Sequence, residues 1–398
     1  MNPLSPSHPT RVLYSFPHTL GASRICYTAL QEVKGLCVAR ADVLTCPGSV
    51  RRSVSLNSIV WPTLSWGRLR IPYKLLGNMR AFKLHDTIIS RRLERLAGQI
   101  DIVHVWPLGA LETLKVSAKL GIPAVLERPN AHTQFAYEAV RQECERLGVA
   151  LPRGHEHAYR NDVLQREVAE YNLATRILCP SDFVASTFLE RGFSTKRLAR
   201  HQYGFDELAC FADLERSNDG KGLVALFVGG AAPRKGLHFA LEAWLASRAS
   251  QKGKFLIAGE FIPGYAERLS PMLSDPSVKV LGHQRDVSQL MRGSDILILP
   301  SIEEGSALVT YEARGCGCVL LVSGAAGAVC RHMDNSLVHT VGDVQTLTQQ
   351  LNMLDEDRAL LARLRTSSLS TVHELTWTAA GERLLNVYRE TIEMHRSG

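Results

Sequence analysis

No uninterrupted apolar run in the sequence approaches the roughly 18 residues that a membrane-spanning helix requires. The first twenty residues contain only a short apolar run at 12–14, so we expect no signal peptide. The nine cysteines include no Cys-x-x-Cys pair, and an odd number without a disulfide framework is typical of a reducing compartment. These absences predict a cytoplasmic protein.

Two cofactor signatures are also missing. The Gly-x-Gly-x-x-Gly fingerprint of dinucleotide-binding folds is absent after the first predicted strand, where the turn holds only Gly21-Ala22. His155 and His157 form a His-x-His pattern with no third metal ligand nearby in the sequence. We therefore expect neither a nicotinamide cofactor nor a metal site.

The composition is that of a globular protein long enough for two domains. The chain has 398 residues, of which 45% are hydrophobic and 21% are charged. Short apolar runs alternate with helical segments, which is typical of α/β proteins with parallel sheets. Two long helices are predicted near the C-terminus, at 347–364 and 377–394.

The most informative stretch is 293–322, where four segments follow one another at the spacing of a βαβ unit. A strand, a small-residue turn, a helix and a second strand are predicted at 296–299, 303–307, 308–314 and 319–322. Ligands bind at the carboxyl ends of parallel strands. We therefore expect the chemistry in the loop after Pro300.

Two glutamates frame this loop. Glu304 lies at its tip, and Glu312 lies two helical turns further on, on the same helix face. Backbone N–H groups at the helix N-terminus would form an anion site suited to a phosphate, and they belong to Gly305, Ser306, Ala307 and Leu308. The carboxylates would then hold neighbouring hydroxyl groups, which suggests a sugar nucleotide. The alternative is a helix-capping Glu304 and a surface Glu312 on an ordinary α/β unit.

This stretch resembles the signature of family 4 of the retaining glycosyltransferases. Pro300, Ser301, Glu304, Gly305 and Glu312 stand in register with that signature. The resemblance implies the GT-B fold, an α/β architecture in which two Rossmann-like domains face each other across a cleft. It also implies that Glu304 holds hydroxyls of the transferred sugar and that Glu312 holds the ribose hydroxyls.

A second phosphate-binding pattern lies at 229–236, where a Gly-rich turn with basic residues separates a predicted strand from a predicted helix. In the family, an Arg and a Lys five residues apart bind the donor diphosphate in this turn. Lys235 matches the Lys, whereas Gly230 stands at the Arg position. Either Arg234 substitutes for the missing Arg or Lys235 acts alone.

The resemblance assigns two further residues in the first half of the chain. His132 follows a strand predicted at 121–126 and would lie beside the reacting sugar; a core or surface His is the alternative. Gly21 belongs to the loop that would face the donor across the cleft.

Domain boundaries are predicted from the same pattern. We expect an acceptor-side domain at 1–207 and a nucleotide-sugar-binding domain at 208–375, with a polar linker at 207–221. In the family the last helix, here 376–398, packs back on the first domain.

Positive charge is concentrated in the segment 51–99. It holds ten Lys and Arg residues against Asp86 and Glu94, a net charge of +8, together with four aromatic residues. Basic residues mixed with aromatics are typical of an anionic membrane surface. The alternative is a solvated helix face; no nucleic-acid motif accompanies the charge, so we expect no nucleic-acid partner.

These features predict a retaining glycosyltransferase that moves a sugar from a UDP- or GDP-sugar to a glycan, lipid-linked or small-molecule acceptor. Lys235 and the loop amides would neutralise the leaving diphosphate, so the reaction would need neither a metal nor a cofactor. The alternatives are a non-catalytic homologue that binds sugar nucleotides and a sugar-nucleotide epimerase on the same fold.

Overall fold

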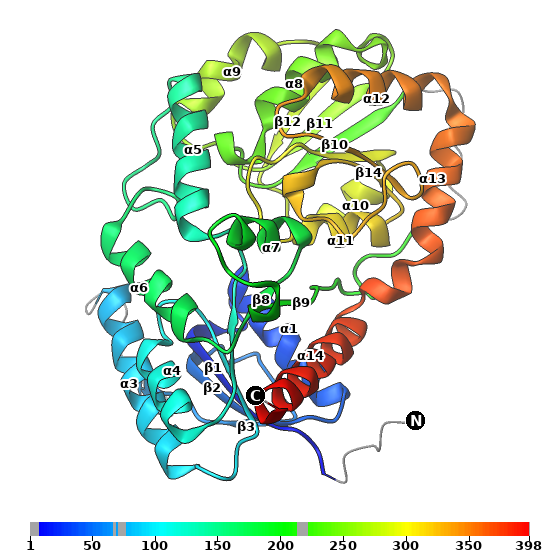
Figure 1. The fold of residues 1–398 in the computed structure, drawn as a ribbon. Helices are drawn as coiled ribbons and strands as arrows, with labels where there is room; N and C mark the ends of the chain where they lie inside the picture. Colours follow the sequence, from blue (N-terminus) through cyan, green and yellow to red (C-terminus); the bar gives the residue numbers. More distant parts are fainter. Residues whose placement is uncertain (1–7, 67–68, 71–76, 213–221, 398) are drawn as a thin grey trace.

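The computed structural model describes residues 8–66, 69–70, 77–212 and 222–397. It has two α/β units, each built on a parallel sheet (Figure 1). The predicted linker 207–221 and the basic segment 51–99 lie partly outside the described residues.

The N-terminal unit is built on a seven-stranded sheet in the order β3-β2-β1-β6-β7-β8-β9. Its strands are β1 (Arg11–Leu20), β2 (Asp42–Val50), β3 (Ile59–Val60), β6 (Ile102–Val105), β7 (Ala124–Glu127), β8 (Arg176–Cys179) and β9 (Leu198–Arg200). The central β6 and β7 are buried along their whole length, as strands of a parallel sheet covered on both faces are.

Helices cover both faces of this sheet (Figure 1). They are α1 (Ile25–Val38), α3 (Asn78–Arg95), α4 (Leu111–Leu120), α6 (Asn161–Leu173) and α7 (Asp182–Leu189). Helix α5 (Thr133–Leu147) instead lies against the C-terminal unit (Figure 1). Two short strands, β4 (Ser65–Trp66) and β5 (Leu69–Arg70), pair antiparallel outside the sheet.

The C-terminal unit is built on a six-stranded sheet in the order β12-β11-β10-β13-β14-β15. Its strands are β10 (Val224–Val228), β11 (Lys254–Ala258), β12 (Val278–Gly282), β13 (Ile296–Leu299), β14 (Val319–Ser323) and β15 (Ser336–His339). Its helices are α8 (Leu237–Ala246), α9 (Tyr265–Leu273), α10 (Val287–Arg292), α11 (Leu308–Gly315), α12 (Val344–Glu356) and α13 (Arg358–Ser370). The single helix predicted at 347–364 is wrong: Asp357 interrupts it, and its side chain caps α13 by accepting from the N–H of Leu360.

The last helix, α14 (Trp377–Ser397), packs against α1 of the N-terminal unit (Figure 1). The two helices approach closely at Gly35 and Gly381, where an added Cβ on Gly35 would lie 2.9 Å from the Cα of Gly381. Phe205 pairs with Thr376 through a β-bridge. The chain therefore leaves the N-terminal unit and returns to it at neighbouring positions. Within the described residues, no helix combines the length and the apolar character that a bilayer span requires.

Helix α5 reaches from the N-terminal unit to the C-terminal unit (Figure 1). Oε1 of Glu143 in α5 lies 2.8 Å from Nε2 of His238 in α8. The two units are thus in direct contact along one side of the molecule, next to the loops described below.

Candidate active site

A cluster of charged side chains lies where the carboxyl ends of β10 and β13 meet. Lys235 and Arg234 belong to the 3-10 turn η2 (Pro233–Lys235) before α8, and Glu304 lies in the loop after β13, the strand that pairs with β10. Oε2 of Glu304 lies 3.0 Å from Nη1 of Arg234, and its Oε1 forms an ion pair with Nζ of Lys235. The two loops predicted to bind phosphate therefore meet in one place.

Electrostatics keep this cluster charged. Burial acts to raise the pKa of Glu304, but Arg234 and Lys235 outweigh it and lower that pKa. Burial opposes the charge on Arg234, yet the carboxylates of Glu304 and Glu303 raise its pKa. The pKa of Lys235 is lowered chiefly by burial, with Arg234 contributing. Two cations and two carboxylates thus neutralise one another in a nearly dry site.

Glu303 links the two units, a role that the sequence did not indicate. Its side chain is fully buried. Oε1 accepts a hydrogen bond from the N–H of Ala131 at 2.9 Å, and Oε2 lies 3.0 Å from Nε2 of His157. Burial would raise the pKa of Glu303, but His157, Arg234 and the Ala131 N–H lower it to about 2. In the sequence, the one feature that could have pointed to this contact is the pair of adjacent glutamates after a buried strand. Glu304 pairs with residues of its own unit, whereas Glu303 contacts the N-terminal unit.

Gly305 lies directly against the N-terminal unit. A Cβ added to it would come within 1.5 Å of the carbonyl oxygen of Pro129, so no other residue fits in this arrangement. The hydroxyl of Ser181 donates to the carbonyl of Gly305 at 2.5 Å. The loop after β13 is therefore closed onto the N-terminal unit.

The start of α11 differs from the prediction that Glu304 and Glu312 share one helix face. The helix begins at Leu308 with Ala307 as its N-cap, so Glu304 precedes the helix and does not share a helix face with Glu312. The N–H of Ala307 donates to the carbonyl of Ala326 at 3.2 Å. Ser306 donates from its hydroxyl to the carbonyl of Gly327 at 2.8 Å. Of the predicted phosphate-binding amides, that of Ala307 is thus already engaged in this conformation.

Among the described residues, no ion pair or hydrogen bond joins Glu312 or Gly21 to the charged cluster. Glu312 is half-buried in α11, and burial raises its pKa. The pKa of Tyr27 in α1 is raised by burial and, in smaller part, by Glu312, so Glu312 faces the N-terminal unit. Gly21 follows β1 with φ of +80°, and an added Cβ would lie 2.2 Å from Cγ2 of Val54. Its role here is to allow the turn into α1.

His132 caps α5. Its Nδ1 accepts from the N–H of Gln134 at 3.2 Å, and its ring packs 5.0 Å from that of Phe188 and 5.2 Å from that of Tyr171. Burial, together with two nearby arginines, lowers its pKa to about 3, so the imidazole is neutral. Among the hydrogen bonds of the described residues, none joins His132 to Glu304. The structure brings Glu304, Lys235 and Arg234 together and holds His132 in an aromatic cluster next to Ala131.

Comparison with known proteins shows which proteins this chain is similar to. Residues 222–357 match the family described as glycosyl transferases group 1. A D-inositol 3-phosphate glycosyltransferase of Segniliparus rotundus is 25% identical over 73% of this chain and 65% of its own length. A Campylobacter jejuni relative, N,N'-diacetylbacillosaminyl-diphospho-undecaprenol alpha-1,3-N-acetylgalactosaminyltransferase, is 24% identical over 43% of this chain. The chain spans only 45% of that relative's length.

The whole fold is shared with solved structures. Anabaena HepE in complex with UDP aligns over 96% of this chain and all of its own, with a TM-score of 0.63 and 16% identity. A sucrose-phosphate synthase of Thermosynechococcus elongatus aligns over 97% of this chain and all of its own, with a TM-score of 0.66 and 16% identity. The chain therefore has the GT-B fold, and residues 222–357 of its C-terminal unit are similar to group 1 glycosyltransferases.

Proposed function

We propose that this protein is a retaining glycosyltransferase that moves a sugar from a UDP- or GDP-sugar to a glycan, lipid-linked or small-molecule acceptor. The observation that carries the proposal is the meeting of Lys235, Arg234 and Glu304 at the carboxyl edge of the C-terminal sheet. Ligands bind at this edge of open α/β sheets. The site lies within the segment that matches group 1 glycosyltransferases.

We expect donor binding to replace the ion pairs of Glu304 with ion pairs to the donor diphosphate. In the conformation described, Glu304 occupies both Arg234 and Lys235. The diphosphate of a donor would take over the two cations, which neutralise the charge that grows on the leaving group. Glu304 is then free to hold hydroxyls of the transferred sugar. These cations do the work that a metal ion does elsewhere, so we propose transfer without a metal at the diphosphate.

The remaining predicted residues keep supporting roles. Glu312 would hold the ribose hydroxyls, and the amides at the start of α11 would contact the diphosphate. His132 would lie near the reacting sugar and Gly21 would face the donor; both assignments rest on the resemblance. We also propose that residues 1–207 with 376–398 bind the acceptor, and that 208–375 bind the donor.

The bond changes that we propose are those implied by the resemblance to the retaining glycosyltransferases. The bond between the anomeric carbon and the diphosphate oxygen breaks, and the acceptor oxygen attacks from the same face. The departing diphosphate accepts the acceptor's proton. Closure of the loop after β13 onto Pro129 would exclude water from the cleft and limit hydrolysis of the donor.

A donor screen tests this proposal. Nucleotide release and product formation would be measured with UDP- and GDP-sugars for wild type, Glu304→Ala, Glu312→Ala and Lys235→Ala. Glu267→Ala, an exposed change in α9, is the matched control. We expect turnover with one donor, reduced at least about 100-fold in Glu304→Ala and Lys235→Ala and retained in the control. Interconversion of the free sugar nucleotide would instead indicate an epimerase. Donor binding without turnover, whichever acceptor is added, would indicate a non-catalytic homologue.

We further propose that α3 contacts an anionic membrane surface on the cytoplasmic side, where a lipid-linked acceptor resides. Four exposed basic residues lie on one face of this helix, at 100° per residue: Arg80, Lys83, Arg91 and Arg95. Arg92 is engaged differently, because it donates to the carbonyl of Trp61 and stacks over its ring. Exposed Trp61 and Leu84 add apolar contact area beside the charge.

Vesicle co-sedimentation tests this surface. Wild type should bind vesicles containing phosphatidylserine and lose binding in the double variant Arg91→Glu, Arg95→Glu, each charge contributing about 1 kcal/mol. The double variant Arg141→Glu, Arg331→Glu, which changes two exposed arginines outside α3, serves as the charge-matched control. Equal binding of the wild type and the double variant would contradict the membrane role.

A further inference from the structure

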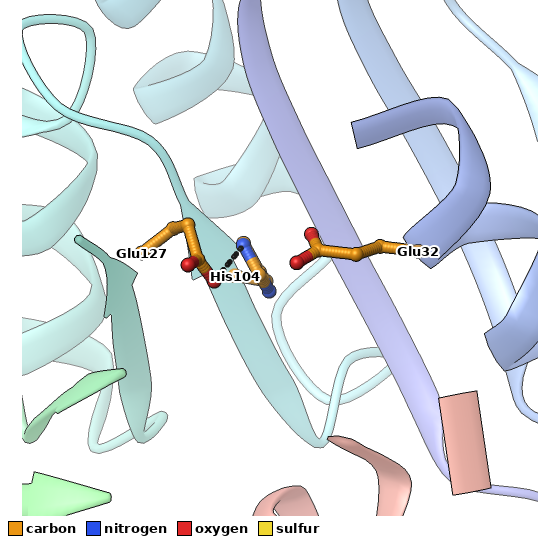
Figure 2. A group of neighbouring side chains, drawn as sticks. All are labelled: Glu32, His104 and Glu127. Atoms are coloured by element: carbon orange, nitrogen blue, oxygen red, sulfur yellow. Dashed lines mark ion pairs between the residues drawn. The ribbon is translucent and has the colours of Figure 1, made fainter. Parts of the chain in front are cut away.

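The N-terminal unit holds a second polar cluster, deep in its core and separate from the residues assigned above. It consists of Glu32 from α1, His104 from β6 and Glu127 from the end of β7 (Figure 2). Glu32 is 3% exposed, and His104 and Glu127 are fully buried. One potential ligand atom of each lies within 4.8 Å of the other two, and this is the one such group found among the described residues.

The partner of Glu32 defines which of its oxygens is free. The indole N–H of Trp106 donates to the hydroxyl oxygen of Tyr14 at 2.8 Å. The hydroxyl proton of Tyr14 is therefore directed to Oε2 of Glu32, which lies 2.6 Å away. Oε1 of Glu32 has no hydrogen-bond partner although it is buried.

Glu127 and His104 follow the same pattern. Oε1 of Glu127 accepts from the hydroxyl of Tyr203 at 2.7 Å and lies 3.1 Å from Nε2 of His201. Nδ1 of His104 lies 2.6 Å from the hydroxyl of Tyr388 in α14. The opposite atoms, Oε2 of Glu127 and Nε2 of His104, have no hydrogen-bond partner and face each other at ion-pair distance, 3.8 Å apart (Figure 2).

Each of the three side chains thus has one atom held by an outer hydrogen bond and one buried atom without a hydrogen-bond partner. Buried polar atoms in native proteins are nearly always satisfied, so three unsatisfied atoms in one cluster require an explanation. Outer hydrogen bonds from tyrosine or histidine to the far atom of each ligand are the arrangement that orients metal ligands.

We propose that Glu32, His104 and Glu127 bind one Zn²⁺ ion as a structural site. Two carboxylate oxygens and one imidazole nitrogen are ligands that Zn²⁺ accepts, with water or a neighbouring group in the fourth position. A divalent cation also cancels the charge of two carboxylates that are otherwise buried together. Mg²⁺ and Ca²⁺ favour more oxygen ligands and no imidazole.

The place of the site in the fold defines its role. The ligands are too deeply buried to touch a substrate. The ion would tie α1 to the two central strands, and Tyr388 and Tyr203 would connect it to α14 and to the segment leading out of the N-terminal unit. It would therefore stabilise the region where the chain passes between the two units, without taking part in the transfer chemistry.

Metal analysis tests the site independently of any turnover. Protein produced without a histidine tag would be analysed by inductively coupled plasma mass spectrometry, with about one zinc per chain expected. Chelation with EDTA should lower Tm by at least about 5 °C, and added Zn²⁺ should restore it. Glu32→Gln and Glu127→Gln preserve side-chain volume but remove an anionic ligand. Both should lose the zinc and have a Tm that no longer responds to EDTA.

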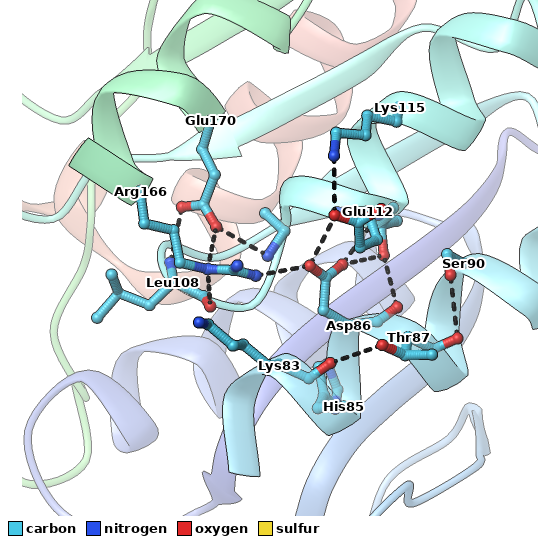
Figure 3. Close-up of polar contacts among 12 residues, drawn as sticks. Lys83, His85, Asp86, Thr87, Ser90, Leu108, Glu112, Lys115, Arg166 and Glu170 are labelled. Carbon is cyan, nitrogen blue, oxygen red and sulfur yellow. Dashed lines mark hydrogen bonds and ion pairs between the residues drawn. The ribbon is translucent and has the colours of Figure 1, made fainter. Parts of the chain in front are cut away.

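Glu170→Gln is the matched control. Glu170 is also a fully buried carboxylate of the N-terminal unit, but its oxygens accept from the N–H groups of Leu108 and Ala110 (Figure 3). This variant should be less stable and keep its zinc. A wild-type zinc content below about 0.1 per chain, with a Tm unaffected by EDTA or Zn²⁺, would overturn the proposal and leave a proton-sharing or water-filled network. Donor turnover is measured separately, so failure of the metal site leaves the proposed function intact.

Discussion

Gly230 is the residue at which this chain departs from the diphosphate-binding pattern of the family that it resembles. It is exposed, and an added Cβ would meet no atom within 4 Å. The neighbouring Arg234 is turned toward the carboxylates of Glu303 and Glu304. The position therefore has room for the missing cation, and the structure contains no steric reason for its loss.

Restoring that cation should strengthen donor binding. Gly230→Arg adds one partly exposed charge near the proposed diphosphate site, which contributes about 1 kcal/mol. We expect the KM for the donor to fall about five-fold, with kcat little changed. Gly230→Gln has a similar length without the charge and should leave KM unchanged. An equal effect of both variants would show that charge is not the cause.

At the scale of elements, the loops of the N-terminal unit are held by a buried ionic network (Figure 3). Asp86 of α3 accepts from the N–H groups of Glu112 and Thr113 at the start of α4, each at 2.9 Å. Arg166 of α6 donates to the same carboxylate at 2.7 Å and to the carbonyl of Leu108. One aspartate thus caps α4 and fastens it to two other helices.

Asp86→Asn should destabilise the protein strongly. The change removes one of the two charged partners of the largely buried Arg166, leaving only Glu170, and weakens two helix-capping bonds, at a cost of about 2 kcal/mol. Lys115→Gln removes the ion pair between exposed Lys115 and Glu112 in the same region and should cost less than about 0.5 kcal/mol. Urea unfolding measures the change in the free energy of unfolding for both variants. Similar small losses in the two variants would contradict the structural role of Asp86.

The loop after β13 is the second element whose contacts make a prediction. Gly305→Ala introduces a Cβ that collides with the carbonyl of Pro129, so the loop cannot close as described. We expect kcat to fall at least about 10-fold with circular dichroism unchanged, because each unit folds as before. Gly324→Ala, where an added Cβ meets nothing within 4 Å, should be neutral. Full activity of Gly305→Ala would mean that closure onto Pro129 is not needed for transfer.

At the scale of the whole molecule, the contacts between the two units carry charge. Glu303 accepts from Ala131 and pairs with His157 across the interface, and its folded-state pKa of about 2 lies below the ordinary 4.5. Since the folded state favours the carboxylate form, this contribution is fully present above pH 4.5. It is lost as the pH falls toward 2.

The pH dependence of Tm should reveal this contact. Between pH 5 and pH 3, wild type should lose about 2 kcal/mol more stability than Glu303→Gln, which has no proton to take up at this site. Glu267→Gln should follow the wild-type curve, since Glu267 is exposed. Parallel curves for wild type and Glu303→Gln would contradict the assignment of the acid-sensitive contact.

Local patterns in the sequence predicted the parts of the fold and site that depend on nearby residues. The strand at 296–299 and the helix beginning at Leu308 are confirmed, because their periodicity lies within one short segment. Contacts between distant residues could not be predicted: Glu303 and Ala131 are 172 positions apart. The same holds for Glu32, His104 and Glu127, none of which has a neighbouring ligand in sequence to mark it.

Lys235 and Arg234 are the groups that we propose to receive a nucleoside diphosphate, and isothermal titration of UDP and GDP tests this binding without any acceptor. We expect one of the two to bind, with Kd weakened at least about 10-fold in Lys235→Ala and unchanged in Glu267→Ala. Binding of neither nucleotide, or equal binding by wild type and Lys235→Ala, would contradict the proposed donor site.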